Sequence, residues 1–117
     1  MYRVITCNTN GIRAAARKGF FGWLVQQKAD VVCIQEIKAK EEQLADAVFY
    51  PKGYQCYYNE AERPGYAGTA IYCRQKPQKI TTRLDWDIVD LEGRYIQVDF
   101  PGLSVVSDRP WITSPPH

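Results

Sequence analysis

The residues of this chain best suited to chemistry are two asparagines and a glutamate. Asn8 and Asn10 come where an N-terminal apolar stretch ends, and Glu36 follows the uninterrupted apolar run of residues 31–34. A carboxylate at the end of a buried strand is costly unless it is paired, hydrogen-bonded or bound to a metal. Mg²⁺ prefers oxygen ligands and typically takes one or two protein carboxylates, together with water and phosphate oxygens. Glu36 and the amide oxygen of Asn8 would therefore form a partial magnesium site.

The same residues also have a purely structural interpretation. Two asparagines at the end of a strand are typical of a turn into a helix, with one of them capping that helix. Glu36 can equally be solvated or paired with Lys38, two residues further along. The residue types and their spacing leave both interpretations open.

Several basic and aromatic residues nearby could bind phosphate or a base. Arg13, Arg17 and Lys18 could contact phosphates, or could form the solvated face of an amphipathic helix. Tyr66 stands on a glycine-flanked loop, where an aromatic ring can pack against a sugar or base or simply cover a turn. Arg94 opens a predicted strand as a possible phosphate contact or a surface charge.

The elements that must position these residues form a βαβ unit in the sequence pattern. Residues 2–7 are predicted to form a strand, residues 12–28 an amphipathic helix, and residues 31–34 a strand buried on both faces. Such a unit has parallel strands joined by a right-handed crossover. The carboxyl ends of parallel strands meet at one edge of the sheet, so Asn8 and Glu36 should approach each other.

The remaining elements follow from shorter patterns. A short helix is predicted over residues 40–48, and strands over residues 54–58 and 69–73. Residues 94–100 and 103–106 should form a hairpin with Pro101-Gly102 as its turn. From Ser107 onward the periodicity stops and prolines accumulate, which is typical of a tail.

Composition narrows the class of protein. A length of 117 residues allows a single domain, and a net charge of +2 is too small to indicate nucleic-acid binding by itself. The four cysteines contain no C-x-x-C pair and His117 is the single histidine, which argues against a zinc site of the usual spacing. The cysteine count alone leaves a disulfide framework open, and a reducing interior is favoured. No signal peptide or membrane-spanning run is present, so we expect a cytoplasmic chain without a membrane partner.

Four motifs in order resemble a known family. "NTNGIR", "QEIK", "GYAGTAIY" and "EGRYIQVDF" resemble the N-terminal half of the exodeoxyribonuclease III family of AP endonucleases, within the endonuclease/exonuclease/phosphatase superfamily. The resemblance covers residues 1–107 and implies an α/β fold. We expect the N-terminal half of a four-layer α/β sandwich, essentially one mixed sheet with flanking helices.

The resemblance also implies an activity and site residues. Family members use Mg²⁺ or Mn²⁺ to hydrolyse DNA phosphodiesters beside abasic sites and to degrade duplex DNA from 3′ ends. Double-stranded DNA carrying abasic sites or 3′ ends is therefore the expected partner. Asn8 and Glu36 match the catalytic, metal-binding positions, with Asn10 at the edge of the site. The expected DNA-binding residues are Asn10, Arg13, Lys38 and Tyr66.

Half of the family's catalytic groups are missing. The second half of the family should bring a Y-x-P-x-G stretch, an Asp-x-Asn pair and a terminal "SDH", and none of these occurs here. Arg109 in "SDR" cannot act as a general base. We expect a truncated nuclease with little activity alone, and residues 108–117 as a disordered or out-of-frame tail. A different superfamily phosphodiesterase or a non-catalytic DNA-binding module remains the alternative.

A half-sandwich also carries a folding cost. One inner sheet face, lined by residues such as Val32, Ile71 and Val105, should be left open to water. An exposed apolar face of this size promotes association, so we expect a marginal monomer or a self-associating chain.

Overall fold

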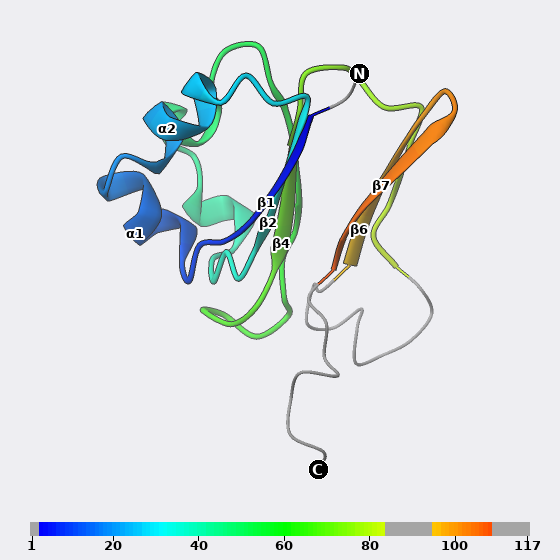
Figure 1. Cartoon of the computed structure of the whole chain (residues 1–117). Coiled ribbons are helices and arrows are strands. Elements are labelled where there is room, and N and C mark those ends of the chain that lie inside the picture. Colours follow the sequence, from blue (N-terminus) through cyan, green and yellow to red (C-terminus); the bar gives the residue numbers. More distant parts are fainter. Residues whose placement is uncertain (1–2, 84–94, 109–117) are drawn as a thin grey trace.

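The chain forms two β-sheets that face each other, with the helices covering the outer face of the larger sheet (Figure 1). The computed structural model describes residues 3–83 and 95–108. The α/β class is as expected. The expectation of essentially one mixed sheet was wrong, because the C-terminal strands form a second sheet of their own.

The larger sheet has the strand order β1-β2-β4-β3. β1 and β2 are parallel, and the other neighbours are antiparallel. The four predicted strands are confirmed to within two residues at each end. They are β1 (Val4–Asn8), β2 (Val31–Gln35), β3 (Gln55–Asn59) and β4 (Thr69–Cys73).

The connection between β1 and β2 contains two helices, so the single helix predicted over residues 12–28 was wrong. α1 (Ile12–Arg17) and α2 (Phe20–Gln26) are separated at Gly19, whose φ of 91° lies in the left-handed region. A left-handed residue cannot continue a right-handed helix, and glycine adopts this conformation without a steric penalty. The amphipathic pattern survives the break, because Ile12 and Leu24 are both fully buried.

Residues 40–48 do not form the predicted helix. Two single 3₁₀ turns replace it, η1 (Glu41–Gln43) and η2 (Ala47–Phe49). Asp46 begins the second turn by accepting a hydrogen bond from the backbone N–H of Val48. A short polar side chain that caps a new turn interrupts the helical ladder at this point.

The smaller sheet is antiparallel, with the order β5-β6-β7. It contains β5 (Lys79–Thr81), β6 (Tyr95–Phe100) and β7 (Leu103–Asp108). The hairpin turn at Pro101-Gly102 is confirmed. β7 runs through Asp108, beyond the point where the strand pattern was expected to stop. Arg94 and residues 109–117 lie outside the described residues.

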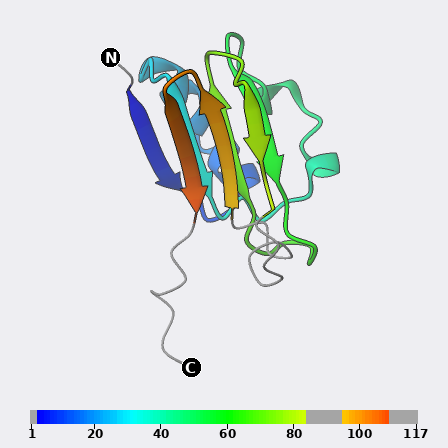
Figure 2. The same ribbon diagram turned by 90° about the vertical axis from the view of Figure 1, so that its right-hand side faces the viewer.

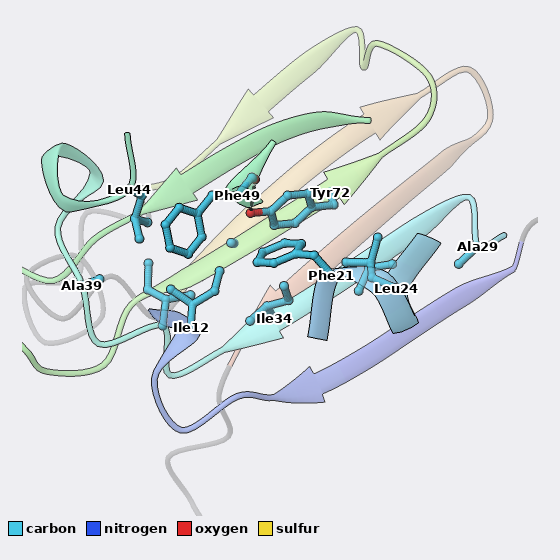
Figure 3. Close-up of a cluster of buried hydrophobic side chains, with 12 residues drawn as sticks. Ile12, Phe21, Leu24, Ala29, Ile34, Ala39, Leu44, Phe49 and Tyr72 are labelled. Carbon is cyan, nitrogen blue, oxygen red and sulfur yellow. Dashed lines mark hydrogen bonds between the residues drawn. The ribbon is translucent and has the colours of Figure 1, made fainter. Parts of the chain in front are cut away.

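Two hydrophobic cores lie on opposite faces of the larger sheet. On the helix side, the ring of Phe21 packs against that of Tyr72, and Leu24 belongs to the same cluster (Figure 3). Between the sheets, residues of β2 and β4 pack against Ile96 and Val105 of the smaller sheet.

The inner face of the larger sheet is therefore covered over β2 and β4, and the expectation that residues such as Ile71 and Val105 would be open to water was wrong. Ile71 is 0% exposed and Val105 is 7% exposed, because β5, β6 and β7 lie over that face. Val32 is also buried, but it points to the helices and not to the second sheet. The self-association expected from an open inner face loses its basis.

The thiols are reduced and mostly buried. Cys33 and Cys73 belong to the core between the sheets, and Cys56 packs on the helix side. Burial raises the pKa of each of these three thiols to about 11. Among the described helices, none has the length and apolar character required to cross a membrane.

Candidate active site

The candidate site forms where β1 and β2 end together. Because the two strands are parallel, Asn8 lies opposite Gln35, and Glu36 is the next residue of the chain. The Nδ2 atom of Asn8 donates a hydrogen bond to Oε2 of Glu36 over 2.5 Å. The approach of these two side chains, expected from the strand ends alone, is confirmed.

The backbone holds this junction closed beyond the strand ends. The N–H of Gly11 donates to the carbonyl oxygen of Glu36 at 2.8 Å, and that of Ile12 to Ile37 at 2.9 Å. Glu36 and Lys38 have φ values of 55° and 52°, in the left-handed region that is uncommon for residues other than glycine. Such conformations cost on the order of 1 kcal/mol each and cluster at functional sites.

Asn8 orients the glutamate through its amide nitrogen. Its Oδ1 atom accepts the backbone N–H of Asn10 at 2.9 Å, which closes a turn at the end of the strand. Asn8 thus presents its amide nitrogen to Glu36 and its amide oxygen to the turn, and its role as a second metal ligand stays a prediction. The turn at the strand end is confirmed, but neither asparagine caps α1, whose N-cap is Gly11 without a side-chain hydrogen bond.

Lys38 points into the cluster. Its Nζ atom donates to Oδ1 of Asn10 at 2.5 Å and lies 3.7 Å from Oε1 of Glu36. The Glu36 side chain is only 14% exposed, whereas that of Lys38 is 38% exposed. The ion pair foreseen as the structural alternative is present, and it forms inside the same cluster as Asn8 and Asn10.

Two hollows flank this cluster, and both carry basic side chains. One has a volume of about 470 Å³ and brings Arg13, Arg17 and Lys38 together. The other, of about 350 Å³, contains Lys18 beside Asn8. The guanidinium of Arg13 also donates to the carbonyl oxygen of Lys38 at 3.2 Å, which fixes it near the cluster. The arrangement suits a ligand with several phosphate groups that lie across the site.

The loop that carries Tyr66 is tied to the same segment. The N–H groups of Ile37 and Lys38 donate to the carbonyl oxygens of Gly68 and Ala67 at 3.1 and 2.8 Å. Tyr66 is 39% exposed, and the guanidinium of Arg63 lies 5.4 Å from the centre of its ring. The ring is thus displayed at the surface beside the site.

Sequence reasoning missed two residues that hold this loop. A Cβ atom on Gly68, whose φ is 87°, would lie 2.7 Å from Cγ1 of Ile37, so only glycine fits. The Nζ atom of Lys40 donates to the carbonyl oxygens of Ala61 and Glu62 and pairs with Glu60 at 3.1 Å. The paired glycines around Tyr66 were the available signal for the first, whereas nothing in the sequence indicated the second.

The donor set suits a magnesium ion held by one carboxylate. Glu36 supplies that carboxylate, and Asn8 keeps it oriented. Within residues 3–83 and 95–108 no group of three or more histidine, cysteine, aspartate or glutamate side chains gathers, either here or elsewhere. Mg²⁺ does not require a full protein cage, because water and substrate phosphates commonly complete its six ligands.

The sequence and the fold of this chain are both similar to those of known proteins. Residues 5–117 match the Endonuclease/Exonuclease/phosphatase family. The exodeoxyribonuclease of Bacillus subtilis (strain 168) is 34% identical over 106 residues, which are 90% of this chain and 41% of that protein. The DNA-(apurinic or apyrimidinic site) endonuclease of Dictyostelium discoideum is 30% identical over 105 residues, 90% of this chain and 29% of that protein.

The structural comparison agrees. An AP endonuclease from Archaeoglobus fulgidus superimposes with a TM-score of 0.78 at 28% identity, covering 93% of this chain and 41% of that one. The chain therefore spans less than half the length of each of these relatives.

Proposed function

Because the chain belongs to the endonuclease/exonuclease/phosphatase family, we propose that it carries the metal-binding half of a DNA nuclease site. The relatives include an exodeoxyribonuclease and AP endonucleases, so the proposed substrate is double-stranded DNA with abasic sites or 3′ ends. The observation that carries the proposal is the hydrogen-bonded pair of Asn8 and Glu36 at the joined ends of two parallel strands.

The residues have distinct roles in this proposal. Glu36 would hold Mg²⁺ or Mn²⁺, and Asn8 keeps its carboxylate turned toward the site. A bound metal would neutralise a phosphate oxygen and support the departing 3′ oxygen. Asn10 with Lys38, and Arg13 beside them, would face the DNA backbone. The exposed ring of Tyr66 would pack against a sugar or base of the same strand.

The chain supplies no evident group to activate water. Its sequence contains no Asp-x-Asn pair, and its single histidine is His117. General-base catalysis typically contributes a factor of about 10²–10⁴, so metal and phosphate binding without it should give little turnover. We propose that the isolated chain binds metal and DNA and cuts poorly.

The test separates binding from cutting. Mn²⁺ binding to the purified chain is measured by electron paramagnetic resonance, and incision with a duplex containing one abasic site, with and without Mg²⁺. Glu36→Gln removes the ligand charge at constant size, and Glu42→Gln, an exposed glutamate of η1, is the matched control. We expect Mn²⁺ binding to be lost in Glu36→Gln and kept in Glu42→Gln, with incision close to background throughout.

Other outcomes contradict the proposal in different ways. Equal Mn²⁺ binding by both variants would remove Glu36 from the metal site. Metal-dependent incision at a rate typical of complete nucleases would show that a water-activating group lies within this chain. Duplex binding that is unaffected by Mg²⁺ and by Glu36→Gln would instead favour the non-catalytic DNA-binding alternative, for which the basic hollow at Arg13 and Arg17 is the supporting observation.

A further inference from the structure

The loop between β3 and β4 has buried ends and an exposed aromatic ring. Figure 1 and Figure 2 both show this green loop, residues 60–68, at the lower end of the larger sheet, where β1 and β2 also end. Ala61 and Ala67, near the two ends of the loop, are 3% and 5% exposed. Tyr66 lies between them and is far more exposed. The loop is therefore attached on both sides of the ring that it displays.

Lys40 makes the attachment at the start of the loop. Its Nζ atom donates to the carbonyl oxygens of Ala61 and Glu62 at 2.6 and 2.8 Å, and it lies 3.1 Å from Oε2 of Glu60. An ammonium group has three N–H donors, so these three acceptors can engage all of them. The side chain of Lys40 is only 20% exposed. It is therefore placed to hold the loop and not to contact a ligand.

Glu60 joins the same attachment from the loop side. Its Oε1 atom accepts the backbone N–H of Glu41 at 2.7 Å, while Oε2 pairs with Lys40. The segment at Lys40 is itself fixed, because its backbone N–H donates to Oε1 of Gln43 at 2.9 Å. We call the ammonium of Lys40, the carboxylate of Glu60 and the two carbonyl groups that Lys40 holds the loop latch.

The loop latch and the candidate site lie on one short segment of the chain. Lys40 comes two residues after Lys38, whose backbone N–H donates to the carbonyl oxygen of Ala67 at 2.8 Å. The end of the loop is thus attached at the site and its start at the latch. Loss of the latch would release the residues before Tyr66 and, with them, the position of the ring relative to Glu36.

We propose that Lys40 is a positioning residue for DNA binding, which acts through the loop latch to hold Tyr66 where a DNA strand can pack against it. The assignment rests on the proposed function, in which Tyr66 contacts a sugar or base. Ordering a loop at the moment of binding costs conformational entropy, so a loop that is already held should bind more tightly. The competing explanation is a direct contact between Lys40 and a phosphate, since lysines commonly bind the DNA backbone.

A double-mutant cycle separates these explanations. Fluorescence anisotropy measures the affinity for a labelled duplex with one abasic site, in Mg²⁺, for the parent, Lys40→Met, Tyr66→Ala and the double variant. The loss of one stacked ring should weaken binding by about tenfold, and we expect about the same from Lys40→Met. If Lys40 acts through Tyr66, the double variant should also lose about tenfold, whereas two independent contacts should lose about a hundredfold.

Charge and folding are controlled separately. Lys52→Met removes the same charge from an exposed lysine before β3, at the opposite end of the sheet, and should bind the duplex as the parent does. Mn²⁺ binding at Glu36 should be unchanged in Lys40→Met, and circular dichroism melts check that every variant folds. Loss of Mn²⁺ binding together with DNA binding would show a general structural role for Lys40 and overturn the proposal.

Glu60→Gln gives a second test, in which the two explanations predict opposite signs. Removing an acidic charge should favour DNA binding if Lys40 contacts a phosphate, because the lysine is then released from its partner. If the latch is what matters, Glu60→Gln should weaken binding although the chain becomes more positive. Glu42→Gln makes the same charge change outside the latch and is the matched control. Tighter or equal binding by Glu60→Gln, compared with Glu42→Gln, would overturn the proposal.

The latch and the proposed function fail separately. A parent chain that binds no duplex, or a Tyr66→Ala variant that binds as tightly as the parent, would reject the proposed role of Tyr66 and the positioning role that depends on it. Hydrogen exchange tests the latch without DNA, since the amides of residues 61–66 should exchange faster in Lys40→Met than in Lys52→Met. Equal exchange in these two variants would reject the latch even if the duplex is bound.

Discussion

At the scale of single residues, four polar residues form the site through hydrogen bonds and one ion pair with one another. Asn8 donates to Glu36, Lys38 donates to Asn10, and Asn10 in turn gives its backbone N–H to Asn8. Lys38 also lies 3.7 Å from the same carboxylate that would hold a metal. Its ammonium group therefore competes with any metal cation for the charge of Glu36.

Replacing Lys38 with methionine should strengthen metal binding. Two unit charges about 4 Å apart interact by about 1 kcal/mol in water and several times more near a protein surface, and partial exposure of Lys38 favours the lower value. We expect Lys38→Met to bind Mn²⁺ about 5- to 10-fold more tightly in a calorimetric titration. Lys38→Arg keeps the charge and is the control, and weaker binding by Lys38→Met would show that the lysine supports the metal instead of opposing it.

The sequence indicated which residues meet at the site but not how they are oriented. The positions of Asn8 and Glu36 follow from two parallel strands that end at one edge, which a pattern of apolar runs can predict. The direction of the Asn8 amide depends on a single backbone N–H at Asn10. The inward direction of Lys38 depends on a left-handed backbone at a non-glycine residue, which no sequence pattern specifies.

At the scale of elements, the site depends on a loop held against the end of β2. Residues 60–68 are attached through the backbone of Ile37 and Lys38 and through the side chain of Lys40. The backbone N–H of Glu41 and the ammonium of Lys40 lower the pKa of Glu60 in this loop. The position of Tyr66 is thus set partly by backbone contacts between the motifs "QEIK" and "GYAGTAIY" and partly by Lys40, which lies outside them.

Gly68→Ala should loosen this attachment. An added Cβ atom would lie 2.7 Å from Ile37, and alanine would also have to adopt a φ of 87°. The backbone strain costs about 1–2 kcal/mol and the overlap about 1–3 kcal/mol more, so urea unfolding should show a loss of roughly 2–5 kcal/mol. Gly53→Ala has a similar φ but open space around it, and should lose only the first part. Equal losses in the two variants would mean that the contact with Ile37 is unimportant.

Whether the sequence predicts an element correctly depends on how clearly its own few residues show the pattern of a strand or a helix. β4 was predicted at its observed limits because both of its faces are buried and its apolar run is continuous. β5 was missed because it has three residues, too few to show alternation. The break at Gly19 was missed because the helical pattern continues on both sides of it.

At the scale of the whole molecule, buried thiols connect stability to pH. The pKa values of Cys33, Cys56 and Cys73 are raised from 9.0 to about 11, mainly because burial disfavours the thiolate. The unfolded chain therefore releases these protons first as the pH rises. Their contribution to stability is complete below pH 9 and is lost progressively as the pH rises toward about 11.

Thermal melts between pH 8 and pH 11 test this expectation. The melting temperature should fall steadily above pH 9, and Cys33→Ala should make the decline shallower because one of the three thiols is removed. Burial also raises the pKa of Tyr58 and Tyr72, so the decline should continue above pH 10. A melting temperature that stays constant from pH 9 to pH 10.5 would contradict the prediction.

The order of the elements along the chain has a consequence for biosynthesis. The candidate site and the helix-side core lie entirely within residues 5–73, and the strands that cover the other face come later. Since a chain emerges from the ribosome N-terminus first, at about 5–20 residues per second, we expect the site to assemble on the nascent polypeptide before β5–β7 exist as a sheet. During that interval Val31, Cys33 and Ile71 would face solvent, and a ribosome stalled after β4 would present chaperones with an assembled site and an uncovered apolar sheet.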